Sequence, residues 1–239
     1  EWGLPPVRRI MREWSLSPDL VLGLFPPWFG PPQPDWPSTV RLSGFAMLGD
    51  EAPLDPALEG WLDDGPAPIV FTRGAAHPGN RAFFEAALEA ADALDSRSLL
   101  IGPGDAVPPR LPDGARRIDY APFGRLLDQS AALVSHAGAG TCAHAFRAGI
   151  PHLGVPVAFD QLDNATRLDD LGAGTCLPAT RFTAARSTRR LERLLSSTDV
   201  REACALARER MQADRPLVAV CDQILEASSE VAVEPVDEA

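Results

Sequence analysis

The chain has 239 residues, of which 45% are hydrophobic and 23% are charged, and this balance excludes a mainly disordered protein. Its 22 basic and 33 acidic residues give a net charge of −11, so the average surface repels a nucleic-acid backbone and any anionic ligand must be bound locally. The four cysteines are widely spaced, which predicts neither a zinc site nor a disulfide framework and fits a reducing cytoplasm. No apolar run approaches the roughly 18 residues of a membrane span, and residues 1–10 do not resemble a signal peptide. We therefore expect a cytoplasmic protein with no integral membrane segment.

The amino-terminal part of the chain is rich in proline, and residues 1–68 contain about half of the 24 prolines. Proline interrupts every stretch there that could form a long helix, so only strands over 20–25 and 40–42 and a helical turn or two over 56–62 are predicted. The chain begins at Glu1 without a methionine, and we interpret it as a fragment of a longer protein.

From Ile69 onward, short apolar runs alternate with amphipathic stretches, a pattern typical of βα units and a parallel sheet. Strands are predicted over 69–72, 98–101, 117–120, 132–135, 152–157 and 173–177. Helices are predicted over 80–94, 123–129, 138–148, 161–171, 183–195, 199–213 and 216–227, with Asn80, Thr183 and Asp199 as caps. The fold class is thus α/β, a Rossmann-like parallel sheet with helices on both faces. The tail after Glu226 is acidic and poor in large apolar residues, so we expect it to be disordered.

A glycine-rich turn follows the strand predicted over 132–135. His136 comes directly after this strand, and Gly138, Ala139, Gly140 and Thr141 then open a helix. In a parallel sheet this turn lies at the carboxyl edge, where glycines let the backbone approach an anion and the first helical N–H groups lack internal partners. His136 and Thr141 add side-chain donors. The pattern favours a phosphate site, although such a turn also occurs as a simple link between a strand and a helix.

A second polar group follows the next strand, at the same edge of the predicted sheet. Asp160 and Gln161 provide carboxylate and amide groups suited to two adjacent sugar hydroxyls, and Asn164 follows one helical turn later. The alternative is that Asp160 only caps the helix that begins there.

The spacing of these residues resembles the nucleotide-sugar signature of UDP-glycosyltransferases of the GT-B fold, in particular bacterial sterol-glucosyltransferase-like and antibiotic-tailoring members. The resemblance spans about residues 20–225, is strongest over 118–174 and is carried by Tyr120-Ala121-Pro122, His136-Ala137-Gly138-Ala139-Gly140-Thr141, Ala148-Gly149-Ile150-Pro151, Pro156, Asp160-Gln161 and Asn164.

The resemblance implies roles for individual residues. The nucleobase and ribose would contact Tyr120, Ala121, Pro122, Phe123 and His144. The donor diphosphate would contact His136, the turn Gly138, Ala139, Gly140 and Thr141, the first donor loop at Gly74, and Asn164. The donor sugar would contact Asp160 and Gln161.

Some positions depart from the family pattern. Ala75 stands where Ser or Thr is usual, and Arg73 is unusual in the first donor loop, where it would either add positive charge or point to solvent. Phe123 replaces a frequent Gln, and His144 stands where plant members have a Glu for the ribose.

The resemblance also implies a domain division, with 1–50 as the end of an acceptor domain and the interdomain linker, 51–225 as the donor-binding domain and 226–239 as a disordered tail. The general base and the acceptor pocket of the family lie in an amino-terminal domain that this sequence lacks. No catalytic residue is therefore assigned here, and His77 and His152 are interpreted as packing or surface residues. We expect the fragment to bind nucleotide without efficient sugar transfer.

For the intact enzyme the resemblance implies inverting transfer from a UDP- or dTDP-hexose to a hydroxyl of a small lipophilic or natural-product acceptor. Fixed donors would stabilise the leaving diphosphate, so neither a metal nor another cofactor is expected. Two alternatives remain open. The first is an NAD-dependent oxidoreductase, because a dinucleotide fingerprint also fits Gly138, Gly140 and Ala143, with Asp160 about 20 residues later. The second is a non-catalytic nucleotide-sugar-binding module, which a lone donor-binding half can be.

Overall fold

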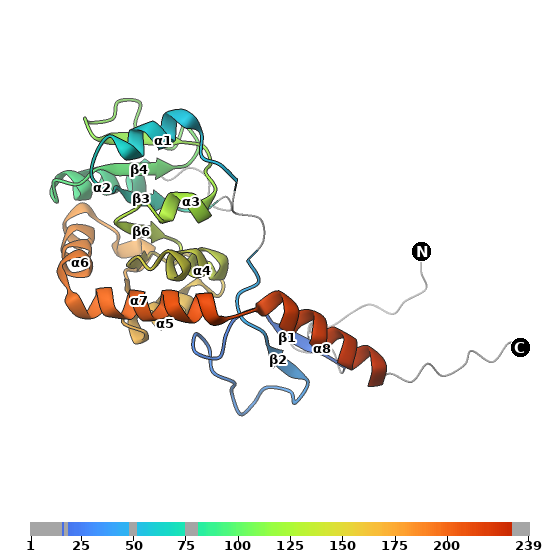
Figure 1. The fold of residues 1–239 in the computed structure, drawn as a ribbon. Helices are drawn as coiled ribbons and strands as arrows, with labels where there is room; N and C mark the ends of the chain where they lie inside the picture. Colours follow the sequence, from blue (N-terminus) through green and yellow to red (C-terminus); the bar gives the residue numbers. More distant parts are fainter. Residues whose placement is uncertain (1–15, 17–18, 48–51, 75–80, 231–239) are drawn as a thin grey trace, which may run out of the picture. The chain divides into compact units, whose positions relative to one another are not determined.

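The computed structural model describes residues 16, 19–47, 52–74 and 81–230. These residues form two sheets with flanking helices (Figure 1). The strands are β1 (Val21–Gly23), β2 (Val40–Leu42), β3 (Ile69–Thr72), β4 (Ser98–Ile101), β5 (Ala115–Ile118), β6 (Ala132–Ser135), β7 (His152–Gly154) and β8 (Gly174–Cys176). The helices are α1 (Pro56–Asp63), α2 (Arg81–Asp92), α3 (Phe123–Leu127), α4 (Ala139–Ala148), α5 (Gln161–Asp170), the 3-10 turn η2 (Ala179–Arg181), α6 (Ala184–Ser196), α7 (Thr198–Ala213) and α8 (Pro216–Glu230).

The chain divides into two compact units, one made of residues 1–46 with 214–239 and the other of residues 47–213. In the first unit, β1 and β2 pair in parallel, and the amide of Gln223 on α8 donates to the Leu42 carbonyl of β2. Phe29 and Phe45 are buried there, with ring centroids 5.1 Å apart. An aromatic cluster thus stabilises the proline-rich segment, which has little regular structure.

The second unit contains a six-stranded sheet in the order β5-β4-β3-β6-β7-β8, and every neighbouring pair is parallel. The chain fills one half of the sheet outward from β3 and then returns to β6, which pairs with the other side of β3. The loops after β3 and β6 therefore diverge at the topological switch point, which is where ligands bind in open α/β sheets.

Alternate residues of the strands pack on opposite faces of this sheet. Ile69 and Phe71 of β3 pack in one cluster with α2 and α6, whereas Val70 packs on the other side with α1, α3 and α4. All three side chains are fully buried. Because both faces are covered, the strands consist of continuous apolar runs, and this is the pattern that predicted them. The α/β class with helices on both faces is confirmed.

Several predicted elements have other bounds in the structure. β5 begins and ends two residues before the predicted 117–120, because this edge strand is only partly buried and tolerates Arg116 and Arg117 within it. β7 ends at Gly154 instead of Val157, since Pro156 has no N–H group with which to continue the ladder. Helix α7 begins at Thr198, and the hydroxyl of Ser197 accepts the Val200 N–H at 3.3 Å, so Asp199 is a first-turn residue and not the cap.

Helix α8 continues to Glu230, four residues past the point where a disordered tail was predicted to begin, and the remaining tail lies outside the described residues. Residues 214–225 group with the amino-terminal segment and not with the donor-binding domain to which the sequence assigned them. The functional meaning of the predicted division stays a prediction. None of the described helices is both long and apolar enough to cross a membrane.

Candidate functional site

The loops that follow β3 and β6 meet at the switch point, around the ring of His136. A Cβ atom at Gly74, in the loop after β3, would lie 2.6 Å from Cε1 of His136. A Cβ atom at Gly138 would lie 2.7 Å from Nε2 of the same ring. Both positions therefore require glycine for contact with the imidazole, and Gly74 also needs it because its φ is +74°. The structure brings together two loops that are more than 60 residues apart in the sequence.

Helix α4 begins immediately beside this ring. Gly138 occupies its N-cap position in an extended conformation without a side-chain cap, and the Gly138 carbonyl accepts the first internal bond, from Cys142 N at 3.0 Å. The N–H groups of Ala139, Gly140 and Thr141 precede that bond, so they have no acceptor within the helix. A Cβ atom at Gly140 would meet nothing within 4 Å, so the backbone at this helix start is open to close approach. Amide groups and the helix dipole favour an anion there.

A buried pair of side chains supports the turn from below. The hydroxyl oxygen of Ser135 accepts the backbone N–H of Ala137 at 3.1 Å and lies 2.8 Å from Nε2 of His152. Ala137 has a φ of +62°, a conformation that costs a non-glycine residue about 1–2 kcal/mol. The hydrogen bond from Ala137 to Ser135 holds this strained residue between His136 and the glycine turn.

His152 is almost fully buried, and burial, together with the charge of His136, lowers its pKa to about 3. The imidazole of His152 is therefore neutral at neutral pH. The sequence interpretation of His152 as a packing residue is correct for its burial, but it missed the link between His152 and the glycine turn. His152 opens β7 opposite Leu133, so no signal in the sequence placed its side chain beside Ser135 at the end of β6.

Asn164 joins the two polar loops to each other. Its amide nitrogen donates to the carbonyl of Ala137 at 3.0 Å and to a carboxylate oxygen of Asp160 at 2.8 Å. These two bonds use both of its amide protons, so Asn164 supports the glycine turn from inside and has no amide proton left for a phosphate. The predicted contact between Asn164 and the diphosphate stays a prediction, and these two bonds favour an indirect role through the turn.

Asp160 lies at the N-cap position of α5, but its side chain makes no capping bond. The alternative interpretation of Asp160 as a helix cap is therefore wrong for the side chain. Its carboxylate is exposed and also raises the pKa of the buried Cys142 thiol, in addition to the larger effect of burial. An exposed carboxylate that is held by Asn164 is available to accept hydrogen bonds from hydroxyl groups.

The side chain of Gln161 is buried, and its oxygen accepts the N–H groups of Val157 and Ala158 at 2.9 and 3.0 Å. Gln161 therefore shapes the loop after β7, and only its NH₂ group remains as a donor to a ligand. Phe159, in the same loop, is 88% exposed and has a φ of +59°.

A cavity of about 560 Å³ opens at the carboxyl edge on the β3-β4-β5 side of the switch point. The predicted residues that line it are Gly74, Tyr120, Ala121, Phe123 and His144. The sequence did not predict its other lining residues, which are Thr72, Ile101, Gly102, Pro103 and Asp119. The Gly102-Pro103 turn after β4 was visible in the sequence, and its position at a strand end was the signal that could have placed it there.

The aromatic groups of the cavity differ in their freedom. Phe123 and His144 contact each other edge to face, with ring centroids 5.6 Å apart. Tyr120 is 78% exposed, whereas Ala121 and Pro122 are buried, and Pro122 precedes α3 at its N-cap position. Tyr120 is thus free to stack on a planar ligand, and Phe123 and His144 form a fixed wall.

Arg73 does not line this cavity. Its guanidinium lies over the ring of Phe83, 5.4 Å from the centroid, and burial lowers its pKa. Ala75 and His77 lie outside the described residues. Among the residues that are described, no three His, Cys, Asp or Glu side chains come together in a way that could hold a metal ion.

The site has four parts. They are a cavity with an exposed tyrosine, a helix N-terminus whose amides have no acceptor within the helix, an imidazole held between two glycines, and an exposed carboxylate. It can hold a flat group, an anion and a polyol in that order along the edge of the sheet.

Comparison with known proteins agrees with this geometry. Residues 88–227, more than half of the chain, match the family described as erythromycin biosynthesis protein CIII-like, C-terminal domain. The chain belongs to this family, which is homologous to antibiotic-tailoring glycosyltransferases of the GT-B fold. The resemblance seen in the sequence is thereby confirmed.

Among curated proteins, the chain is 34% identical over 174 residues to O-mycaminosyltylonolide 6-deoxyallosyltransferase of Streptomyces fradiae, covering 71% of this chain and 40% of that protein. It is 35% identical over 185 residues to glycosyltransferase GtfC of Amycolatopsis orientalis, covering 73% and 42%. The calicheamicin glycosyltransferase CalG4 has the same fold, with a TM-score of 0.72 at 22% identity over 93% of this chain and 55% of that one. The chain thus spans less than half the length of these two curated relatives.

Proposed function

We propose that this chain is the donor-binding half of a glycosyltransferase that transfers a hexose from a UDP- or dTDP-sugar to a hydroxyl group of a natural product. The observation that carries the proposal is the convergence of Gly74, His136 and the start of α4 at the switch point beside a 560 Å³ cavity. The names of the curated relatives, which include sugar transferases of antibiotic biosynthesis, support the reaction class.

The donor lies along the carboxyl edge of the sheet. The base occupies the cavity between Tyr120 and the wall formed by Phe123 and His144. The diphosphate lies at the start of α4, where it accepts hydrogen bonds from backbone amides and from His136. A charge-assisted hydrogen bond is worth about 1.5–3 kcal/mol, so a few of them outweigh the repulsion from a chain of net charge −11.

The sugar lies next to the loop after β7. The carboxylate of Asp160 accepts hydrogen bonds from its hydroxyl groups, and the NH₂ group of Gln161 donates one. Because Asn164 connects Asp160 to the carbonyl of Ala137, the sugar and phosphate subsites are held in a fixed relation to each other.

Transfer inverts the anomeric carbon by direct displacement. A base from the amino-terminal half of the enzyme deprotonates the acceptor hydroxyl, and that oxygen bonds to the anomeric carbon as the bond to the diphosphate breaks. His136 and the α4 amides stabilise the negative charge that develops on the leaving diphosphate, so no metal or other cofactor is required. The protein acts in the cytoplasm, and this chain alone binds the donor without efficient transfer.

The choice between the two nucleotides is tested by binding. A fold neighbour, glycosyltransferase VinC, was solved in complex with dTDP, which favours including dTDP beside UDP. Calorimetry with UDP, dTDP and NAD should show binding of at least one of the two diphosphates and none of NAD. Binding of NAD alone would instead favour the oxidoreductase alternative, which the family membership does not support.

Two substitutions separate the phosphate and sugar subsites. His136→Ala should weaken UDP or dTDP binding by about 1–3 kcal/mol, because one hydrogen bond to a charged group is lost. Asp160→Ala should leave the free diphosphate unaffected and weaken only the sugar-bearing donor. Asp163→Ala is the matched control, since Asp163 is an exposed acid on the same helix that pairs with Arg167. Equal losses for both ligands in Asp160→Ala would contradict the sugar role.

The non-catalytic alternative needs a separate test. The isolated chain should neither hydrolyse the bound sugar nucleotide nor transfer the sugar, whereas the longer protein with its amino-terminal half should do so. Turnover by the isolated chain at a rate near that of the longer protein would show that the general base lies within these 239 residues.

A further inference from the structure

A second concavity, of about 390 Å³, lies in the unit formed by residues 47–213 and shares no lining residue with the cavity described above. Its lining consists of one buried leucine and five exposed arginines: Leu177, Arg181, Arg186, Arg189, Arg190 and Arg193. Five of the 22 basic residues of a chain with net charge −11 therefore surround one hollow.

The placement of these arginines follows from the geometry of α6. At 3.6 residues per turn, the four arginines of this helix fall within an arc of about 100°. The buried residues Ser187, Leu191 and Leu194 lie on the adjacent arc, against the sheet. Glu192, the single acidic residue of α6, falls outside the arginine arc. Arg181 comes from η2 and completes the lining from a second element.

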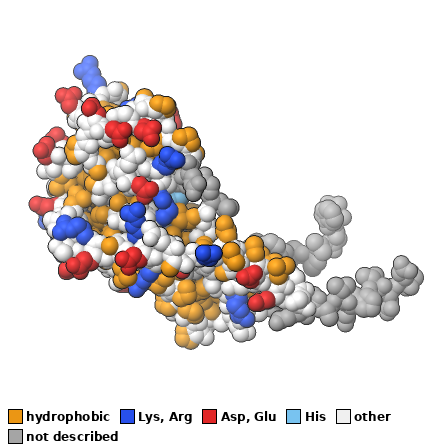
Figure 2. Space-filling model, in the orientation of Figure 1, with side chains coloured by type: hydrophobic (Ala, Val, Ile, Leu, Met, Phe, Trp, Pro, Cys, Tyr) orange, Lys and Arg blue, Asp and Glu red, His pale blue; other side chains and the backbone are white. Residues whose placement is uncertain are grey.

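The positive charge in this hollow is not neutralised from within. None of the five guanidinium groups forms an ion pair or a hydrogen bond with another residue of the described part of the chain. The pKa of the Cys176 thiol is raised by burial and by Asp169, and the positive charge of Arg190 partly opposes that rise. Basic side chains are visible on the surface over α6 and α7 (Figure 2). Like charges that are held close without counter-charges repel one another, and a bound anion removes that cost.

We propose that this hollow, the arginine pocket, binds a small molecule that carries several phosphate groups. Guanidinium groups bind phosphate in a bidentate manner, which is why arginine is enriched in phosphate sites. The concavity is within the size range of small-molecule sites, about 300–1,000 Å³, and is not a flat stripe of the kind that suits an extended macromolecule. Because no aromatic residue lines it, the pocket selects for the phosphate chain and not for a nucleobase.

The probe for this proposal is inorganic tripolyphosphate, titrated into the chain by calorimetry at low ionic strength. The double variant Arg189→Gln/Arg190→Gln should weaken the affinity at least about tenfold, because it removes two guanidinium groups. Both residues are exposed, so the variant should fold normally. Raising the salt concentration should weaken binding to the wild-type chain, since the contacts are charged and exposed.

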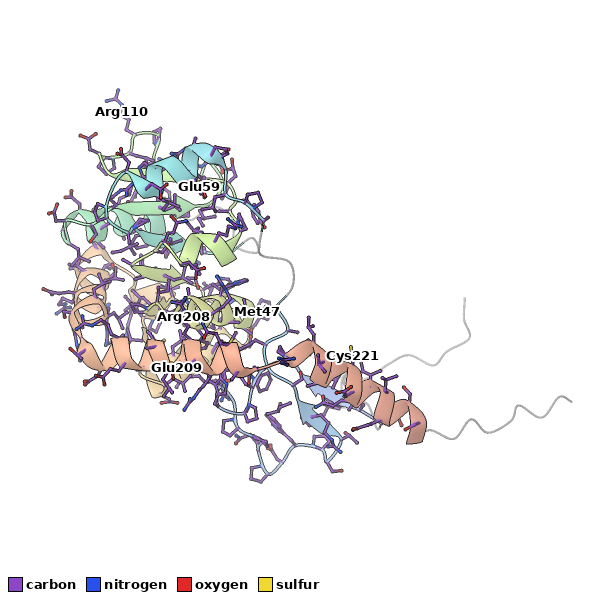
Figure 3. The ribbon with its side chains drawn as sticks, in the orientation of Figure 1. Met47, Glu59, Arg110, Arg208, Glu209 and Cys221 are labelled. Atoms are coloured by element: carbon purple, nitrogen blue, oxygen red, sulfur yellow. The ribbon has the colours of Figure 1, made fainter. Side chains whose placement is uncertain are left out.

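The control removes the same two charges elsewhere on the surface. Arg110 projects from the loop between β4 and β5, away from the sheet (Figure 3). Arg201 is an exposed residue on α7. Arg110→Gln/Arg201→Gln should change the affinity by less than about twofold, as expected for charges outside the pocket. An equal loss in both double variants would show only an effect of net charge and would overturn the proposal.

Two further outcomes would also overturn it. If His136→Ala abolishes tripolyphosphate binding while Arg189→Gln/Arg190→Gln does not, the anion binds at the start of α4 and the arginine pocket has no such role. If tripolyphosphate does not bind but acidic polyglutamate does, the surface recognises an acidic polypeptide instead. Because the arginine pocket and the donor site share no residue, either proposal can fail while the other holds.

Discussion

The hydroxyl of Ser135 should contribute more to stability than its size suggests, because two buried groups depend on it. Ser135→Ala leaves the N–H of Ala137 and Nε2 of His152 without their partner, and both lie in the interior. Each unsatisfied buried polar group costs about 1–3 kcal/mol, so two of them should lower the free energy of unfolding by about 2–6 kcal/mol. At about 2–4 °C per kcal/mol for a protein of this size, the melting temperature should fall by at least about 4 °C.

The assays are urea denaturation and thermal melting, both followed by circular dichroism, with Ser130→Ala as the matched control. Ser130 is also buried, but its hydroxyl only donates to the Leu126 carbonyl, which keeps a second bond from Gln129 N at 3.1 Å. Ser130→Ala should therefore cost about 1 kcal/mol or less.

Nucleotide binding gives a second readout of the same substitution. Ser135 does not reach the proposed ligand, but it holds Ala137 at positive φ between His136 and the glycine turn. Relaxation of this turn should weaken UDP or dTDP binding by about five- to tenfold, corresponding to about 1 kcal/mol of lost preorganisation. If Ser135→Ala is no less stable than Ser130→Ala, or if it binds nucleotide as the wild type does, the supporting role of this pair is refuted.

Three other substitutions test separate features. His152→Gln should make the stability of the chain less sensitive to acid. The pKa of His152 is about 3 in the folded chain and about 6.5 in the unfolded chain, so below pH 6.5 the unfolded state binds a proton that the folded state does not. The free energy of unfolding of the wild type is therefore unaffected by this group above pH 6.5 and falls by up to about 1.4 kcal/mol per pH unit below it. In urea denaturation, the free energy of unfolding of the wild type should fall between pH 7 and pH 5 by about 2 kcal/mol more than that of the variant. Gly138→Ala should weaken nucleotide binding by displacing the His136 ring, whereas Gly140→Ala has space for its methyl group and should raise the melting temperature slightly. Arg97→Lys should cost about 2 kcal/mol in urea denaturation, because one guanidinium donates to three backbone carbonyls and an ammonium group cannot reproduce that geometry.

Each of these has a contradicting result. Equal pH slopes for the wild type and His152→Gln would show that another group controls the acid transition. Unchanged nucleotide affinity in Gly138→Ala would show that the imidazole can move without consequence. If the Arg97→Lys variant is as stable as the wild type, the three hydrogen bonds of the Arg97 guanidinium do not contribute to stability.

The local pattern of the sequence was sufficient for most of the elements. Continuous apolar runs such as 69–72 and 132–135 predicted buried parallel strands, because both faces of such strands are covered. The glycine turn after His136 predicted an anion site, because only glycine permits that backbone approach. The edge strand β5 was misplaced by two residues, since its pattern is set by partial burial and carries little periodicity.

The tertiary structure decided which of these residues meet. Strand order is not encoded in any local stretch, so the sequence could not show that β3 and β6 are neighbours or that Gly74 contacts the ring of His136. It also could not show that Asn164 uses both amide protons inside the protein, or that His152 and Ser135 hold the turn. The reason is physical: backbone propensity and hydrophobic period depend on near neighbours, whereas the partner of a polar side chain is fixed only when distant strands pack together.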